Sequence, residues 1–315
     1  MRAGAFLTAV ARRLGESCRR HGRSLLAARD AVRGYDLSAG NVHAARHAVA
    51  EALAGDGWPA DVVRCVAAAW IVEADYLLLP DADVAGADVV VGNPPYVRLE
   101  DVPEWRMRRY RRTCPTMTGR ADLYVGFYER SLRSLTTGGR LAFICADRWM
   151  RNQYGRALRR MITTGFAVEA VVTMHDVDAF EDQVSAYPAV TLIRRGAQRG
   201  AAAVQTTREF DREAAHDLVE WLHDRRGMAD TGNRSGRGFS ASRLPHWFSG
   251  DELWPSGSPE RLAMIDSIQE KFPPIGDPSS HPGRHRCGDR RGRRVRHRRP
   301  RTGRAVPPAA AGDGA

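Results

Sequence analysis

Apolar residues follow two alternating patterns along this chain. In some segments they recur every three or four residues, which is the period of a helix, and in others they form short runs typical of strands. The helical pattern covers Ala5 to Arg20, Asn41 to Leu53, Asp122 to Leu135, Tyr154 to Thr164, Asp211 to His223 and Ser256 to Lys271. The short runs cover Ala31 to Leu37, Ala87 to Gly92, Arg140 to Ala146, Ala167 to Thr173 and Ala189 to Arg194. Residues Val62 to Val72 fit a helix, a strand or both.

This alternation predicts an α/β fold with a doubly wound, mostly parallel, Rossmann-like sheet and helices on both faces. The run from Ala87 to Gly92 contains three consecutive valines, which favours a strand buried on both faces. Beyond Gly196 the pattern weakens. We therefore expect three parts: a catalytic α/β domain over 1–196, a helical extension over 197–276 with a loop from Thr231 to Ser242, and a disordered tail over 277–315.

The positive charge of the chain is concentrated in that tail. The whole chain carries a net +11, and residues 281–315 carry +9 through eleven arginines and two aspartates, so the first 280 residues carry only +2. The overall charge is therefore weak evidence for nucleic-acid binding by the body of the protein. A frameshift near Ser280 is our hypothesis for the tail, because a shifted reading frame can encode a less basic continuation.

Cysteine spacing and hydropathy exclude several other classes of protein. The five cysteines are scattered and none has the spacing of a metal ligand pair, so we expect neither a disulfide framework nor a metal site. No apolar run reaches the length of a transmembrane helix, and the N-terminus lacks the layout of a signal peptide. These features predict a cytoplasmic protein without a membrane partner.

Polar side chains follow three of the predicted strands. Asp36, Asp75 and Asn93 each come directly after an apolar run, or within a few residues of one. Ligands of open α/β sheets bind beyond the carboxyl ends of the strands. We therefore expect these three residues to lie along one rim and to form a single site.

The tetrapeptide Asn93-Pro94-Pro95-Tyr96 carries the chemistry. The amide oxygen of Asn93 and the carbonyl of Pro94 offer two hydrogen-bond acceptors, and the prolines fix the backbone between them. An amino group conjugated to a ring is a poor nucleophile, and two acceptors that grip its hydrogens shift it towards a nucleophilic geometry. The ring of Tyr96 offers a flat face on which a base can stack. By itself, an Asn-Pro-Pro sequence is also typical of a simple turn.

Over residues 3 to about 195 the chain resembles the class I adenine-N6 DNA methyltransferases of restriction-modification and phage-defence systems. The tetrapeptide matches their catalytic motif, with Tyr96 also in a base-stacking position. Further matching segments are Gly34 to Leu37, Ala74 to Leu77, Arg120 to Tyr128, Gly139 to Ile144 and Asp178 to Ala189. The resemblance implies methyl transfer from S-adenosylmethionine to adenine N6 in double-stranded DNA, with a base flipped out of the helix and, in some systems, a partner restriction endonuclease.

The resemblance also implies individual roles. Gly4, Asp36, Leu37, Asp75 and Tyr76 correspond to cofactor-binding positions, and Phe180 corresponds to a residue that packs on the extruded base. Of the family's glycine-rich cofactor turn only Gly4 is present, and the strand before it is missing from the sequence. Two neighbouring strands would then lack a ladder partner, so we expect weak or absent cofactor binding by this chain.

Two other functions remain open. The same tetrapeptide occurs in enzymes that methylate a glutamine amide in a protein, although those are compact and lack the arginine-rich insertion found here between Glu100 and Gly119. That insertion has five arginines from Arg106 to Arg112, which could contact phosphates or form a solvated helix face. The chain could also be an inactive remnant of a methyltransferase gene.

Overall fold

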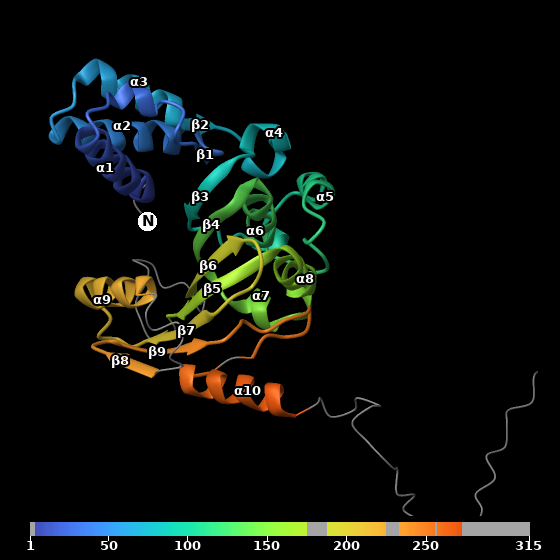
Figure 1. The fold of residues 1–315 in the computed structure, drawn as a ribbon. Coiled ribbons are helices and arrows are strands. Elements are labelled where there is room, and N and C mark those ends of the chain that lie inside the picture. Colours follow the sequence, from blue (N-terminus) through green and yellow to red (C-terminus); the bar gives the residue numbers. More distant parts are fainter. Residues whose placement is uncertain (1–3, 175–187, 225–232, 256, 273–315) are drawn as a thin grey trace, which may run out of the picture. The chain divides into compact units, whose positions relative to one another are not determined.

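The computed structural model describes residues 4–174, 188–224, 233–255 and 257–272. In its N-terminal part, three helices pack around a short two-stranded parallel sheet (Figure 1). The helices are α1 (Ala5–Arg20), α2 (Ala39–Gly55) and α3 (Ala60–Trp70), and the strands are β1 (Gly34–Asp36) and β2 (Ile71–Glu73). The segment that fitted either a helix or a strand is therefore both, because α3 ends where β2 begins.

Apolar side chains on facing sides of these helices make the N-terminal core, which includes Val49, Leu53, Val66 and Trp70. Gly4 precedes α1 with a φ of 82°. A Cβ atom at that position would lie 3.1 Å from the Cα of Ala45 in α2. Glycine is therefore required there both by the left-handed backbone and by the close approach of the two helices.

The second sheet has seven strands in the order β3-β4-β6-β5-β7-β9-β8. The strands are β3 (Ala87–Gly92), β4 (Leu135–Ala146), β5 (Phe166–Thr173), β6 (Pro188–Arg195), β7 (Ala201–Thr206), β8 (Asn233–Gly236) and β9 (Phe239–Leu244). The ladder pairings make β3, β4, β5, β7 and β8 run in one direction, while β6 and β9 run against them. The predicted mostly parallel α/β sheet is thus confirmed, with β6 inserted between two parallel neighbours.

The remaining helices cover this sheet and its loops. They are α4 (Asp81–Val84), α5 (Glu104–Thr113), α6 (Leu123–Ser134), α7 (Arg148–Arg151), α8 (Arg156–Gly165), α9 (Arg212–His223) and α10 (Pro259–Lys271). Four short 3-10 turns accompany them: η1 (Leu25–Ala28), η2 (Tyr76–Leu78), η3 (Leu99–Asp101) and η4 (Gln153–Gly155). None of the helices in the described ranges is long and apolar enough to cross a membrane.

Strand alternation divides the apolar residues of the sheet between two cores. In β7, Ala201 and Ala203 join the main core with α6, α8 and α10, while Ala202 and Val204 join a smaller core against α9. Successive side chains of a strand point to opposite faces, so helices cover both faces of this part of the sheet. This arrangement agrees with the predicted doubly wound layering.

The prediction that Ala87 to Gly92 is buried on both faces is wrong. The segment is a strand with the expected bounds, but Val89 is 65% exposed and Val91 is 40% exposed. The physical reason is its position, since β3 lies at the edge of the sheet and pairs only with β4 within the described residues. β1 likewise pairs only with β2 there.

The segment after Gly196 is more regular than predicted. The expected loop from Thr231 to Ser242 contains a hairpin of β8 and β9, and β7 precedes it. Thus 197–276, expected to be a helical extension, also supplies three strands to the sheet that β3 begins. The division into a catalytic domain and an extension stays a prediction, and the expected disorder of 277–315 concerns residues outside the described ranges.

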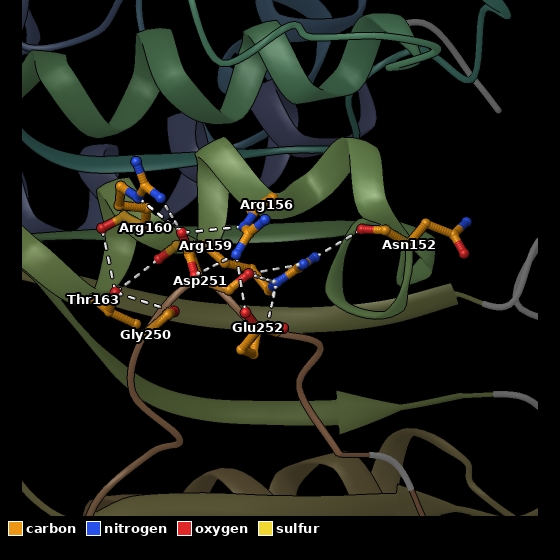
Figure 2. Close-up of polar contacts among 8 residues, drawn as sticks. All are labelled: Asn152, Arg156, Arg159, Arg160, Thr163, Gly250, Asp251 and Glu252. Atoms are coloured by element: carbon orange, nitrogen blue, oxygen red, sulfur yellow. Dashed lines mark hydrogen bonds and ion pairs between the residues drawn. The ribbon is translucent and has the colours of Figure 1, made fainter. Parts of the chain in front are cut away.

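A buried arginine connects α8 to the loop that follows β9 (Figure 2). The side chain of Arg159 is 1% exposed and donates hydrogen bonds to four backbone carbonyls, those of Trp149, Asn152, Asp251 and Glu252. Around it, exposed ion pairs join Arg156 and Arg160 to Asp251. Because buried carbonyls need donors, the guanidinium replaces the water that these groups would otherwise bind.

We expect Arg159→Met to lower the free energy of unfolding by about 3 kcal/mol, because the substitution leaves one buried and three part-buried carbonyls without this donor. Urea unfolding measures this loss. Arg156→Met is the matched control: that side chain is 51% exposed, so its ion pair should contribute much less. Equal losses for the two variants would show that Arg159 is not the connecting residue.

Candidate functional site

The tetrapeptide follows β3 directly and is anchored on both sides. Gly92 is in register with Phe143 of β4, and a Cβ atom on Gly92 would lie 3.3 Å from the Phe143 ring. Asn93 is half-buried, Pro94 is buried, and the half-buried ring of Tyr96 packs against the main core. The strand end, the buried Pro94 and the half-buried Tyr96 therefore fix the backbone that carries Asn93.

Nothing around Tyr96 favours an ionised phenol. Burial raises the pKa of Tyr96 well above its ordinary value, with a smaller contribution from Cys145. Burial likewise raises the pKa of the Cys145 thiol. Both groups stay protonated near neutral pH, so they suit a role in positioning and stacking rather than in taking up a proton.

Asp36 ends β1 and faces the start of α2. One of its carboxylate oxygens accepts a hydrogen bond from the backbone N–H of Ser38 at 2.8 Å, and both accept from the Asn41 side chain at 3.2 and 3.3 Å. A carboxylate has about four acceptor positions, so these bonds orient the group without using all of its capacity. Leu37, the next residue, is 54% exposed and offers an apolar surface beside the carboxylate.

Asp75 follows β2 and contacts the arginine-rich helix. Its carboxylate accepts a hydrogen bond from the Tyr110 hydroxyl of α5 at 2.8 Å. Burial and the neighbouring Asp75 carboxylate both raise the pKa of Tyr110, so the hydroxyl remains a donor at any ordinary pH. Tyr110 thus holds α5 against the strand end that carries Asp75.

Tyr76 belongs to a row of three aromatic rings. Its ring stacks on Tyr35 of β1, with centroids 5.5 Å apart, and on Phe127 of α6, with centroids 5.6 Å apart. Its hydroxyl lies 3.0 Å from the Ser131 hydroxyl. This row joins the N-terminal strands to a helix of the main core.

The structure brings two of the three predicted rim residues to one sheet edge. Asp36 and Asp75 lie at the carboxyl ends of the neighbouring parallel strands β1 and β2. The prediction of a single rim for all three residues is wrong for Asn93, which follows β3 in the other sheet. The two sheets are separate because no described strand pairs with both β1 and β3. Phe180 lies outside the described residues.

Sequence reasoning missed Tyr35 and Phe127 as partners of Tyr76. It also treated the segment from Arg106 to Arg112 only as a run of arginines, although Tyr110 within it is buried and points inwards. The available signal was helical spacing, since Met107 and Tyr110 are three residues apart and share the buried face of α5.

The residues around Asp36 suit the predicted cofactor. Carboxylates at adjacent strand ends accept hydrogen bonds from hydroxyl and amino groups, and the uncovered Leu37 side chain suits contact with a flat ring. Gly4 packs closely on Ala45, and this contact explains why a glycine is needed there without reference to a cofactor. Within the described residues no group of three or more His, Cys, Asp or Glu is placed to bind a metal ion.

Comparison with known proteins adds a family match. Residues 67–180, which run from the end of α3 past α8 and include the tetrapeptide, match the Eco57I restriction-modification methylase model. The matched segment therefore contains Asp75, α5 and Asn93, but not Asp36.

Curated relatives match over a longer stretch. The type II methyltransferase M.BstVI of Geobacillus stearothermophilus is 32% identical over 87% of this chain and 49% of its own length. M.PaeR7I of Pseudomonas aeruginosa is 35% identical over 86% of this chain and 46% of its own length. The chain thus spans about half the length of the curated relatives it matches. A solved methyltransferase subunit of a type I restriction-modification system from Streptococcus thermophilus aligns with a TM-score of 0.48 and 15% identity over 74% of this chain and 46% of that one.

We expect the Tyr110–Asp75 hydrogen bond to stabilise the fold by about 1–2 kcal/mol. A part-buried hydrogen bond to a carboxylate contributes more to stability than one between two neutral groups. A double-mutant cycle of Tyr110→Phe and Asp75→Ala, followed by urea unfolding, isolates that coupling energy, because alanine leaves no acceptor for the hydroxyl. Tyr110→Phe combined with Asp36→Asn is the control pair and should show additive effects. Additive effects in the first pair would remove the link between α5 and Asp75.

Proposed function

We propose that the protein is the catalytic part of a DNA methyltransferase that transfers a methyl group from S-adenosylmethionine to adenine N6, because residues 67–180 match the Eco57I restriction-modification methylase model. The observation that carries the proposal is the anchored tetrapeptide at the end of β3. The proposal is also supported by relatives, because most of this chain is similar to enzymes named type II methyltransferases.

In this proposal Asn93 and Pro94 bind the amino group. The Asn93 amide oxygen and the Pro94 carbonyl accept hydrogen bonds from the two amino hydrogens, which reduces the conjugation of the nitrogen with the ring. Burial of Pro94 holds its carbonyl in place, so acceptor positioning does the work that a strong base would otherwise do. Tyr96 presents a neutral ring for the base to stack on, which is worth about 1–3 kcal/mol.

The cofactor is proposed to lie against the ends of β1 and β2, where it supplies the methyl group. Asp36 would accept hydrogen bonds from the ribose hydroxyls, and Leu37 would cover one face of the adenine ring. Asp75 and Tyr76 would border the same ring, and Gly4 would keep α1 close. The hydrogen bonds from Ser38 and Asn41 orient the Asp36 carboxylate before any ligand arrives, which reduces the entropy lost on binding.

The substrate would be double-stranded DNA with the target adenine flipped out, because the amino group of a stacked base pair is out of reach. Phe180 stays a candidate for packing on that base. A restriction endonuclease or another defence-system subunit is the proposed partner, since the relatives are named after restriction-modification systems. The presence of α5 between the tetrapeptide and α6 favours this substrate over a glutamine amide, because its arginines suit a phosphate backbone.

We expect Asn93→Ala to reduce methyl transfer to duplex DNA by at least a hundredfold, because one of the two acceptors that activate the amino group is removed. Transfer of a radiolabelled methyl group to DNA and, separately, to protein measures this. Asn152→Ala is the control, because that asparagine lies outside the tetrapeptide, and it should leave the rate nearly unchanged.

The same assay separates the alternatives. Transfer by the wild-type chain to protein but not to DNA would favour the glutamine-amide reaction. Transfer to neither acceptor, from a chain that is folded by circular dichroism, would favour an inactive remnant. Full activity of the Asn93→Ala variant would contradict the assigned role of the tetrapeptide.

A further inference from the structure

Helix α5 has two chemically different faces. Met107 and Tyr110 are buried, the first in the main core and the second also hydrogen-bonded to Asp75. The exposed residues of the helix are Glu104, Trp105, Arg108, Arg109, Arg111 and Arg112. The helix is therefore fixed from the inside while its cationic face is turned to solvent.

The arginines of α5 are less neutralised than several arginines close to the sheet. Arg130, Arg140 and Arg194 each form an ion pair with an acidic side chain. In α5 the one ion pair among the described residues joins Arg108 to Glu104, and Arg111 donates to the backbone carbonyl of Gly119. The side chains of Arg109 and Arg112 have neither a hydrogen bond nor an ion pair among the described residues.

These side chains line an open hollow of about 350 Å³. Trp105 and Arg108, Arg109, Arg111 and Arg112 form its lining, and no carboxylate takes part. Trp105 is 51% exposed, with the Arg106 guanidinium 5.1 Å from its ring centroid. A concave surface of unneutralised guanidinium groups suits an anion, and guanidinium geometry suits phosphate oxygens in particular.

Several guanidinium groups side by side suit a polyanion better than a single small anion. A duplex DNA backbone presents phosphates at regular spacing, so one helix can contact more than one phosphate at once. The location agrees with such a partner, because Tyr110 joins α5 directly to the strand end of Asp75. Phosphate contacts of this kind set the register of a protein on DNA without reading its sequence.

We propose that the exposed face of α5 binds the phosphate backbone of double-stranded DNA, and that Arg109 and Arg112 supply the two main contacts. This assignment rests on the proposed DNA methyltransferase function. It gives α5 the task of holding the duplex while the tetrapeptide acts on a base.

Salt dependence of binding tests this assignment. Each phosphate contact adds about 0.9 to the slope of the logarithm of the binding constant against the logarithm of salt concentration. With the full-length chain and a labelled DNA duplex, followed by fluorescence anisotropy, Arg109→Gln/Arg112→Gln should lower the slope by up to about 1.8. Binding near 0.1 M salt should weaken by roughly tenfold or more on the same basis.

Two control variants isolate the location and the charge. Arg208→Gln/Arg212→Gln removes two exposed arginines that also form no ion pair within the described part of the chain, and it should leave the slope unchanged. Arg109→Lys/Arg112→Lys keeps the charge and should retain most of the slope. The arginines of residues 281–315 are present in every variant, so their contribution cancels in the comparison. An equal decrease for the α5 pair and the Arg208/Arg212 pair would overturn the assignment, as would an unchanged slope for the α5 pair.

The readout is independent of catalysis. The Asn93→Ala variant should lose methyl transfer and keep the wild-type salt dependence of DNA binding. The Arg109→Gln/Arg112→Gln variant should instead show a smaller salt dependence. A wild-type chain that transfers no methyl group but shows the α5-dependent slope would contradict the proposed enzyme activity alone. Normal transfer with no α5-dependent slope would contradict the α5 assignment alone.

Discussion

The parallel pairing of β3 with β4 determines where the candidate site lies. The register runs from Val89 opposite Arg140 to Gly92 opposite Phe143, so the ladder ends one residue before Asn93. β4 is itself fixed on its other side by β6, and it places Leu141, Phe143 and Cys145 in the main core. A strand end held by such a neighbour moves little, which is the condition that acceptor-based chemistry requires.

The open edge of β3 explains the largest difference between expected and observed burial. An apolar run is typical of a strand with neighbours on both sides and helices on both faces, but β3 has one strand neighbour in the described chain. Val89 and Val91 are therefore exposed. Proteins usually cover an apolar edge strand with another strand, a helix or a loop. β1 likewise has a single strand neighbour, β2, among the described residues.

Local pattern alone predicted the elements whose residues repeat strongly. The helix from Ala5 to Arg20 and the strand from Ala87 to Gly92 have the predicted bounds. β7 was missed because alanine-rich strands have no β-branched signature, and β8 and β9 because their glycines and serines resemble a loop. In the site, the tetrapeptide was visible because prolines act locally. The inward turn of Tyr110 was not, since it depends on how α5 packs against η2.

Chemistry at the tetrapeptide cannot by itself distinguish DNA from a protein amide, because the nitrogen in both is conjugated and needs the same two acceptors. The distinction must come from surface charge close to the site. Residues 1–280 carry only +2, so a general attraction to phosphate is weak and any phosphate contact must be local. Asp81, Glu169 and Asp251 each neutralise two arginines around the sheet. Helix α5 keeps a cationic face, and the Tyr110–Asp75 hydrogen bond holds this helix next to the strand end. A duplex substrate requires such a surface, whereas a compact enzyme that methylates a protein amide does not.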